Sequence, residues 1–195
     1  EGYGLTETSP VLCVNLPGRK ENAPLRKTGT VGKLLPGLMA RVVDPDSGVV
    51  LSPSQRGILH FRGPNVFEGY LGEPEKTAEV LDEDGWFVTG DLGSFDEDGF
   101  LRIEGRLSRF SKVGGEMVPH GRVEEVVAEV LGLEDGDQPA VAVAGRPDSS
   151  KGEALVLLTT VDIEPNELSK LLAEKGFANL WIPKIILRVD EIPML

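Results

Sequence analysis

The sequence predicts an α+β protein in two parts: a small β-barrel-like or sandwich-like part, then a small α+β domain with helices against one sheet. Two observations lead to this prediction. Residues 1–105 are rich in glycine and proline and contain short strand-like runs separated by turns. Residues 106–195 instead contain helical and strand-like segments in the order α-β-β-α-β. We expect a hinge between the parts, near residues 106–111.

Short strands and one short helix account for most of the first part. Residues 41–44 and 57–63 are typical of strands, because a Pro-Asp-Ser-Gly turn follows the first and glycines bracket the second. A third strand is expected around 86–92. Residues 74–81 predict a helix, since proline is favoured in the first turn of a helix and Pro74 lies there.

Two acidic turns, Asp82–Gly85 and Asp96–Gly99, flank the strand expected at 86–92. Both resemble the start of a calcium-binding loop, which needs a glutamate at its twelfth position. The twelfth positions here are Gly93 and Leu107. Ordinary hairpin turns are therefore the favoured interpretation.

The second part shows apolar residues at helical spacing in two segments, 122–131 and 166–175, and a glycine follows each. Runs typical of strands lie at 140–144, 154–161 and 184–189. This alternation of helices and strands favours helices that pack against one sheet.

Composition limits the classes of function. The chain has 195 residues and a formal net charge of -12, which argues against a nucleic-acid surface because such surfaces need clustered lysine and arginine. Hydrophobic residues make up 40%, as in globular proteins. The single cysteine, Cys13, rules out a disulfide within the chain and suits a reducing compartment. No apolar run approaches the length of a membrane span.

Three polar segments are candidates for chemistry. Residues 3–8 combine an aromatic ring, glycine, hydroxyls and a carboxylate, which suits a hard cation held against phosphate, although a polar turn after a strand is the simpler alternative. Asp91 follows Thr89 and Gly90, and such a carboxylate can accept hydrogen bonds from both ribose hydroxyls or cap its own turn. Residues 106–116 place cations before Gly114 and Gly115, which suits an anionic ligand or a solvated linker.

The order of these segments carries more information than any one of them. Together with residues 63–70, Gly-Pro-Asn-Val-Phe-Glu-Gly-Tyr, and 86–92, Trp-Phe-Val-Thr-Gly-Asp-Leu, they resemble the adenylate-forming superfamily. This superfamily contains acyl-CoA synthetases, luciferases and the adenylation domains of peptide synthetases. The resemblance covers nearly the whole chain. It implies that residues 1–105 end a large adenylation domain and that 106–195 belong to a mobile carboxyl-terminal domain.

The resemblance also implies roles for single residues. Tyr3 would stack on adenine, Asp91 would bind the ribose hydroxyls, and Arg106 would lie beside Asp91. Thr6 and Glu7 would serve catalysis, with Thr6 at the AMP phosphate and Glu7 as a ligand of Mg²⁺. The residues expected on a loop that enters the site for the thiol-transfer step are Lys112, Gly114 and Gly115. ATP and Mg²⁺ are the implied cofactors, and the thiol of a phosphopantetheine arm is the implied acceptor.

Residues 109–118 narrow the resemblance. Arg109 stands where the family usually has an acidic hinge residue. The rest resembles acyl-(acyl-carrier-protein) synthetases, which are often fused to a 2-acylglycerophosphoethanolamine acyltransferase of phospholipid metabolism. The expected reaction is activation of a long-chain fatty acid and its transfer to acyl-carrier protein. Transfer to CoA, a luciferase-like or binding protein without ligation, and a purely structural module remain as alternatives.

The chain begins without methionine and ends at Leu195. We therefore expect a piece of a longer enzyme that lacks the upstream phosphate loop and the downstream catalytic lysine, and that is inactive by itself. The expected location is the cytoplasm, or the cytoplasmic face of the inner membrane if an acyltransferase is fused. Contact with a membrane is expected only through parts of the enzyme outside this chain.

Overall fold

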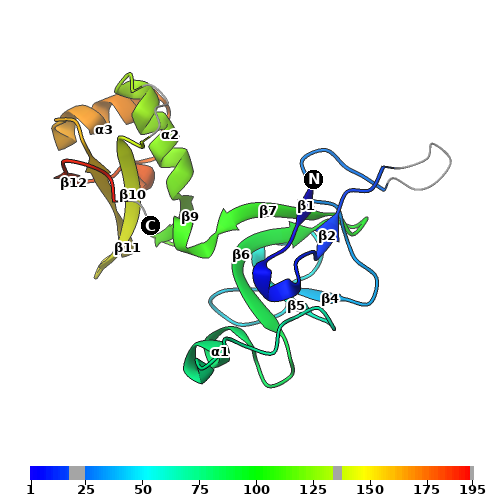
Figure 1. The fold of residues 1–195 in the computed structure, drawn as a ribbon. Coiled ribbons are helices and arrows are strands. Elements are labelled where there is room, and N and C mark those ends of the chain that lie inside the picture. Colours follow the sequence, from blue (N-terminus) through cyan, green and yellow to red (C-terminus); the bar gives the residue numbers. More distant parts are fainter. Residues whose placement is uncertain (18–24, 134–137, 194–195) are drawn as a thin grey trace. The chain divides into compact units, whose positions relative to one another are not determined.

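The computed structural model describes residues 1–17, 25–133 and 138–193. It divides into two compact units, Glu1–Leu107 and Ser108–Leu195 (Figure 1). Sheets and helices occur in both, so the predicted α+β class is confirmed. The assignment of these units to two domains of a longer enzyme stays a prediction.

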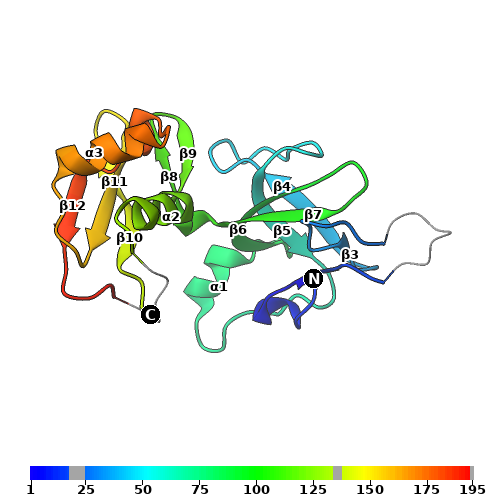
Figure 2. The same cartoon turned by 90° about the horizontal axis from the view of Figure 1, so that it is seen from above.

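The first unit contains two small antiparallel sheets and one helix, α1 (Pro74–Val80). One sheet has the order β1-β2-β3. The other has the order β4-β5-β6-β7, and its four strands are labelled in Figure 2. The strands are β1 (Gly2–Tyr3), β2 (Cys13–Val14), β3 (Lys33–Leu34), β4 (Met39–Val43), β5 (Gly57–Arg62), β6 (Phe87–Phe95) and β7 (Leu101–Arg106).

Both sheets of the first unit cover one apolar core. Leu12 precedes β2, Phe61 comes from β5 and Leu101 from β7, and all three are fully buried. Strands β4 and β7 end their sheet, so the predicted barrel-like part is a pair of open sheets rather than a closed barrel.

The two acidic stretches of the first unit are hairpin turns. Asp82 Oδ1 accepts hydrogen bonds from the backbone N–H groups of Asp84 and Trp86, at 3.0 and 2.8 Å. Asp96 Oδ1 accepts in the same way from Asp98 and Phe100, at 3.0 and 2.9 Å. Each first aspartate therefore caps its own turn, as aspartate commonly does in loops.

The second unit packs two helices, α2 (His120–Val130) and α3 (Pro165–Glu174), against one five-stranded sheet. Val123, Val127, Leu168 and Leu172 line the buried helix faces. In the sheet, β11 pairs with β10 over its whole length, with β12 in parallel, and with β8 at one residue. The strands are β8 (Phe110–Val113), β9 (Glu116–Pro119), β10 (Val141–Asp148), β11 (Gly152–Thr159) and β12 (Ile185–Arg188).

The hairpin β8–β9 was absent from the predicted order α-β-β-α-β. Its strands pair from Phe110 to Val113, and Gly114 and Gly115 form a two-residue turn with φ of 60° and 89°. Two positive φ values are what a tight hairpin turn requires, and only glycine adopts them freely. From the sequence, residues 106–116 were expected to suit an anionic ligand or a solvated linker, and the tight turn at these glycines was not predicted.

We expect the free energy of unfolding of both units to decrease when the pH is lowered from about 7.5 to about 5.5. Burial, with Arg41 near His60 and Arg109 near His120, lowers the pKa of both histidines below 6.5. The unfolded chain therefore binds these protons more readily, so the contribution is fully present above pH 6.5 and is lost as the pH falls toward the folded-state pKa values.

Urea denaturation at the two pH values checks this prediction, because the chain has one tryptophan in each unit, Trp86 and Trp181. Single-tryptophan variants report each unit separately. His120→Gln should reduce the pH dependence in the second unit alone, and an unchanged dependence there would contradict the assignment.

Candidate functional site

The buried carboxylate of Asp91 is the best-defined polar feature of the first unit. Asp91 lies in β6 and is 5% exposed. The Tyr3 hydroxyl donates to its Oδ2 at 2.5 Å, and Arg106 Nε lies 3.0 Å from its Oδ1. Tyr3 belongs to β1 and Arg106 to β7, so three strands bring these side chains together.

The electrostatics of this cluster suit a ligand with two hydroxyl groups. Burial, followed by the hydrogen bond to Asp91 and its charge, raises the pKa of Tyr3 far above its usual value, so the phenol stays protonated and donates. Each carboxylate oxygen can accept more than one hydrogen bond, so Asp91 keeps capacity for further donors. The Arg106 side chain is 57% exposed, whereas the Asp91 side chain is 7% exposed, so the ion pair joins a buried carboxylate to a cation at the surface.

Local sequence explains how β6 presents this carboxylate. Gly90 has φ of 71°, which turns the chain between Thr89 and Asp91. The Thr89 hydroxyl donates to the Leu59 carbonyl at 2.9 Å and accepts from Asp91 N–H at 3.0 Å. The Asp91 carboxylate itself is directed to the Tyr3 hydroxyl and Arg106 rather than to the backbone of its own turn. The role of Thr89 in holding this turn was not predicted from the sequence, although a hydroxyl two residues before an aspartate is a recognisable pattern.

Thr6 and Glu7 lie in the same unit, on the 3₁₀ helix Thr6–Thr8 that follows β1. Thr6 is exposed and Glu7 is half-buried. The Tyr70 hydroxyl donates to Glu7 Oε1 at 2.8 Å, and Phe67 N–H donates to the Glu7 carbonyl at 2.8 Å. The segment 63–70 of the predicted motif set thus supports this short helix, and Tyr70 is a partner that the sequence analysis did not identify.

Glu7 fits one kind of metal site. Across residues 1–17, 25–133 and 138–193, no group of three or more histidine, cysteine, aspartate or glutamate side chains could hold a metal ion. A single carboxylate is nevertheless sufficient for Mg²⁺ that is bound chiefly by substrate phosphates and water. Glu7 would then be the protein ligand, and the metal would offset phosphate charge.

Lys112, Gly114 and Gly115 form a separate group in the second unit, on the β8–β9 hairpin. All three are exposed. Lys112 N–H donates to Glu153 Oε2 at 2.5 Å, and Gly114 N–H donates to the Lys151 carbonyl at 2.8 Å. Of the predicted site residues, the structure thus brings Tyr3, Asp91 and Arg106 together in one cluster. The functional roles of these three residues, and those of Thr6, Glu7, Lys112, Gly114 and Gly115, stay predictions.

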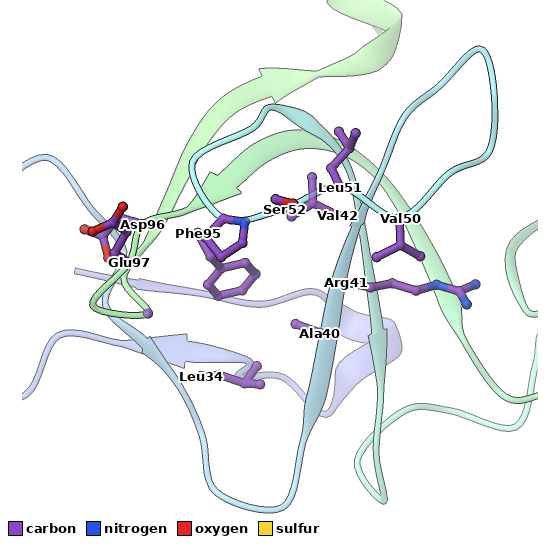
Figure 3. A pocket seen from close by; sticks show the side chains of 12 residues that line it. Leu34, Ala40, Arg41, Val42, Val50, Leu51, Ser52, Phe95, Asp96 and Glu97 are labelled. Atoms are coloured by element: carbon purple, nitrogen blue, oxygen red, sulfur yellow. The ribbon is translucent and has the colours of Figure 1, made fainter.

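A cavity of about 460 Å³ lies elsewhere in the first unit (Figure 3). Apolar side chains line most of it, including Leu34, Val42 and Phe95, and Asp96 and Glu97 lie at one end. None of the predicted site residues lines this cavity. It therefore contributes nothing to the cluster around Asp91.

Two further observations bear on function. Burial raises the pKa of Cys13 to about 12, so its thiol is a poor nucleophile. In the parts of the chain that the structure describes, no helix is long and apolar enough to cross a membrane.

The cluster around Asp91 and the 3₁₀ helix that carries Thr6 and Glu7 are formed by the motifs that resemble the adenylate-forming superfamily. Residues 1–71 match the family model described as AMP-binding enzyme. Residues 1–71 thus belong to this family, the adenylate-forming superfamily, in agreement with the resemblance seen in the sequence.

Relatives of known type agree with this assignment. The chain is 35% identical to a long-chain-fatty-acid–CoA ligase of Escherichia coli O157:H7, over 99% of this chain and 33% of that protein. It is 33% identical to 4-coumarate–CoA ligase 3 of Oryza sativa subsp. japonica, over 99% of this chain and 34% of that protein. The crystal structure of ATP-bound MatB from Rhodopseudomonas palustris has a TM-score of 0.66 and 33% identity, over 98% of this chain and 37% of that one. The chain thus spans about a third of the length of these proteins.

Tyr3→Phe should destabilise the first unit by about 1–3 kcal/mol, because it leaves a buried carboxylate oxygen of Asp91 without its donor. Urea denaturation followed by Trp86 fluorescence measures the change. Tyr70→Phe is the matched control, since its hydroxyl bonds Glu7 on an exposed surface where water can replace it. Equal effects of the two variants would show that the Tyr3–Asp91 bond has no special importance.

Proposed function

We propose that the protein uses ATP to activate a long-chain fatty acid and transfers the acyl group to the thiol of a phosphopantetheine arm. The observation that carries this proposal is the Asp91 cluster, a buried acceptor with remaining capacity for a ribose diol. Membership of the AMP-binding family and the fatty-acid–CoA ligase among the relatives support it.

The chemistry proceeds in two displacements. The fatty-acid carboxylate attacks the α-phosphorus of ATP, a P–O bond forms, and pyrophosphate leaves. The thiol sulfur then attacks the acyl carbon, a thioester forms, AMP leaves, and the thiol proton passes to solvent or a base. Both attacking oxygen and phosphate are anionic, so Thr6 would bind the phosphate and Glu7 would hold the Mg²⁺ that offsets the repulsion.

Two acceptors compete within this proposal. Residues 112–118 favour acyl-carrier protein, within an enzyme that also carries a 2-acylglycerophosphoethanolamine acyltransferase. The names of the relatives favour CoA as the second candidate. Incubation of the complete enzyme with one fatty acid and each acceptor decides between them. Preference for CoA by tenfold or more in kcat/KM would exclude the first candidate.

We also propose a cytoplasmic location, or the cytoplasmic face of the inner membrane if the acyltransferase is present. Fatty acid, ATP and phosphopantetheine thiols are substrates that must meet in one compartment. The single free thiol of Cys13 is compatible with a reducing compartment.

Fatty-acid-dependent exchange of pyrophosphate into ATP by the complete enzyme tests the first displacement. Exchange that requires a long-chain acid would support the proposal and leave the acceptor to be identified. A folded enzyme that shows no exchange with any carboxylic acid would instead favour a protein that keeps the fold without ligation.

Asp91→Asn in the complete enzyme should weaken ATP binding by about tenfold or more, because a charged acceptor for the ribose hydroxyls is lost while the shape is kept. Equilibrium dialysis with ATP measures the effect. Glu129→Gln is the control, since it removes the same charge from an exposed ion pair with Lys175. Unchanged ATP affinity in Asp91→Asn would refute the ribose role.

Gly115→Val should lower the rate of thioester formation at least about tenfold and leave pyrophosphate exchange within about twofold, because valine strongly disfavours a φ of 89°. Gly176→Val is a matched control, as Gly176 has φ of 84° and an added Cβ meets no atom within 4 Å at either glycine. If exchange fell first, Gly115 would belong to the nucleotide site instead.

A further inference from the structure

A buried serine–histidine pair in the second unit has no part in the function proposed so far. Ser111 Oγ lies 2.8 Å from His120 Nε2, and the two residues are 1% and 3% exposed. Ser111 belongs to β8, and His120 is the first residue of α2, directly after β9. The hydrogen bond therefore joins one strand of the hairpin to the helix that follows the other.

The surroundings of this pair are closely packed. A Cβ added to Gly145 of β10 would lie 2.2 Å from Ser111 Oγ and 2.7 Å from Glu153 Oε1, so the serine hydroxyl occupies the space beside a glycine backbone. Arg109, Glu124 and Glu153 are the charged groups that act on the imidazole. Ser111 and His120 thus satisfy each other within the protein, with almost no access for water.

Val113 and Val118 anchor the hairpin in the apolar core, but its other hydrogen bonds to the rest of the second unit are open to water. Trp181 Nε1 donates to Glu116 Oε2 at 3.0 Å, and the backbone bonds of Lys112 and Gly114 go to exposed or half-buried residues. Water competes for such bonds, and their net contribution is correspondingly small. The Ser111–His120 bond differs because its loss leaves a buried polar atom without a partner.

We propose that Ser111 and His120 are positioning residues that hold the β8–β9 hairpin, and with it Gly114 and Gly115, in the orientation that the thioester-forming step requires. This inference rests on the proposed function, in which the hairpin acts in the second displacement. A displacement of about 1 Å in a positioning element can lower a reaction rate about a hundredfold, so one hydrogen bond at the base of the hairpin is sufficient to matter.

The experiment compares four variants of the complete enzyme. Ser111→Ala removes the hydroxyl, His120→Phe removes the imidazole nitrogens, and His120→Gln keeps a group that can bond Ser111. Thr159→Val is the matched control, because Thr159 is fully buried in β11 and accepts a hydrogen bond from Val161 N–H at 3.2 Å. Thr159 is also remote from the hairpin: β11 meets the hairpin at Gly152, which lies seven residues, or about 23 Å along the strand, from Thr159.

Two readouts are needed, hydrogen exchange at the amides of residues 113–116 and the rates of the two displacements. We expect Ser111→Ala and His120→Phe to speed amide exchange and to slow thioester formation about tenfold or more, with pyrophosphate exchange within about twofold. His120→Gln should recover part of the loss, and Thr159→Val should show neither effect.

The possible failures are distinguishable. If the wild-type enzyme forms the acyl adenylate but no thioester with any thiol, the proposed second displacement is refuted, and the positioning role is refuted with it. An active wild type with unchanged thioester rates in Ser111→Ala would overturn the positioning role alone. A parallel loss of both displacements, or an equal loss in Thr159→Val, would assign the pair to general stability and equally overturn it.

Discussion

The burial of one charge, the carboxylate of Asp91, is the constraint on which the first unit depends. A carboxylate that is 5% exposed must be compensated by hydrogen bonds and an opposite charge, because desolvation otherwise costs several kcal/mol. Tyr3 and Arg106 supply this compensation from the first and last strands of the unit. The same three side chains therefore link the first and last strands of the unit and form its candidate nucleotide site.

The second unit differs from the first because it must hold an exposed hairpin on a small domain. Its apolar core packs residues of α2 and α3 on β10 and β11 and includes Val113 and Val118 of the hairpin. The hairpin turn contributes two glycines and no side chain to this core. The strands of the hairpin are anchored in the core by Val113 and Val118, and its base is held in addition by the buried Ser111–His120 hydrogen bond. Packing thus stabilises the domain and its hairpin, and the hydrogen bond adds a directional contact at the base of the exposed turn.

Much of the fold was predictable because its periodic segments are long. The helix expected at 122–131 is α2, and the helix expected at 166–175 is α3, each within two residues at either end. The hairpin β8–β9 was not predictable in the same way, since its strands have four residues each and no clear alternation. Tyr70 and Thr89 were missed because their partners, Glu7 and Leu59, lie 63 and 30 residues away. Asp91 was recognised as a candidate, but only folding shows that Tyr3 is its donor.

The boundary between the units follows from the way two arginines are bound. Arg106 is tied to the first unit through Asp91 and the Thr89 carbonyl. Arg109 is tied to the second unit through Glu124, whose other carboxylate oxygen accepts from Val143 N–H of β10. Only Leu107 and Ser108 separate these anchors, so a change in the relative placement of the units would have to be absorbed by a few backbone dihedral angles there. Arg109, at the position where the resemblance predicts an acidic residue, thus forms an ion pair with Glu124 of α2.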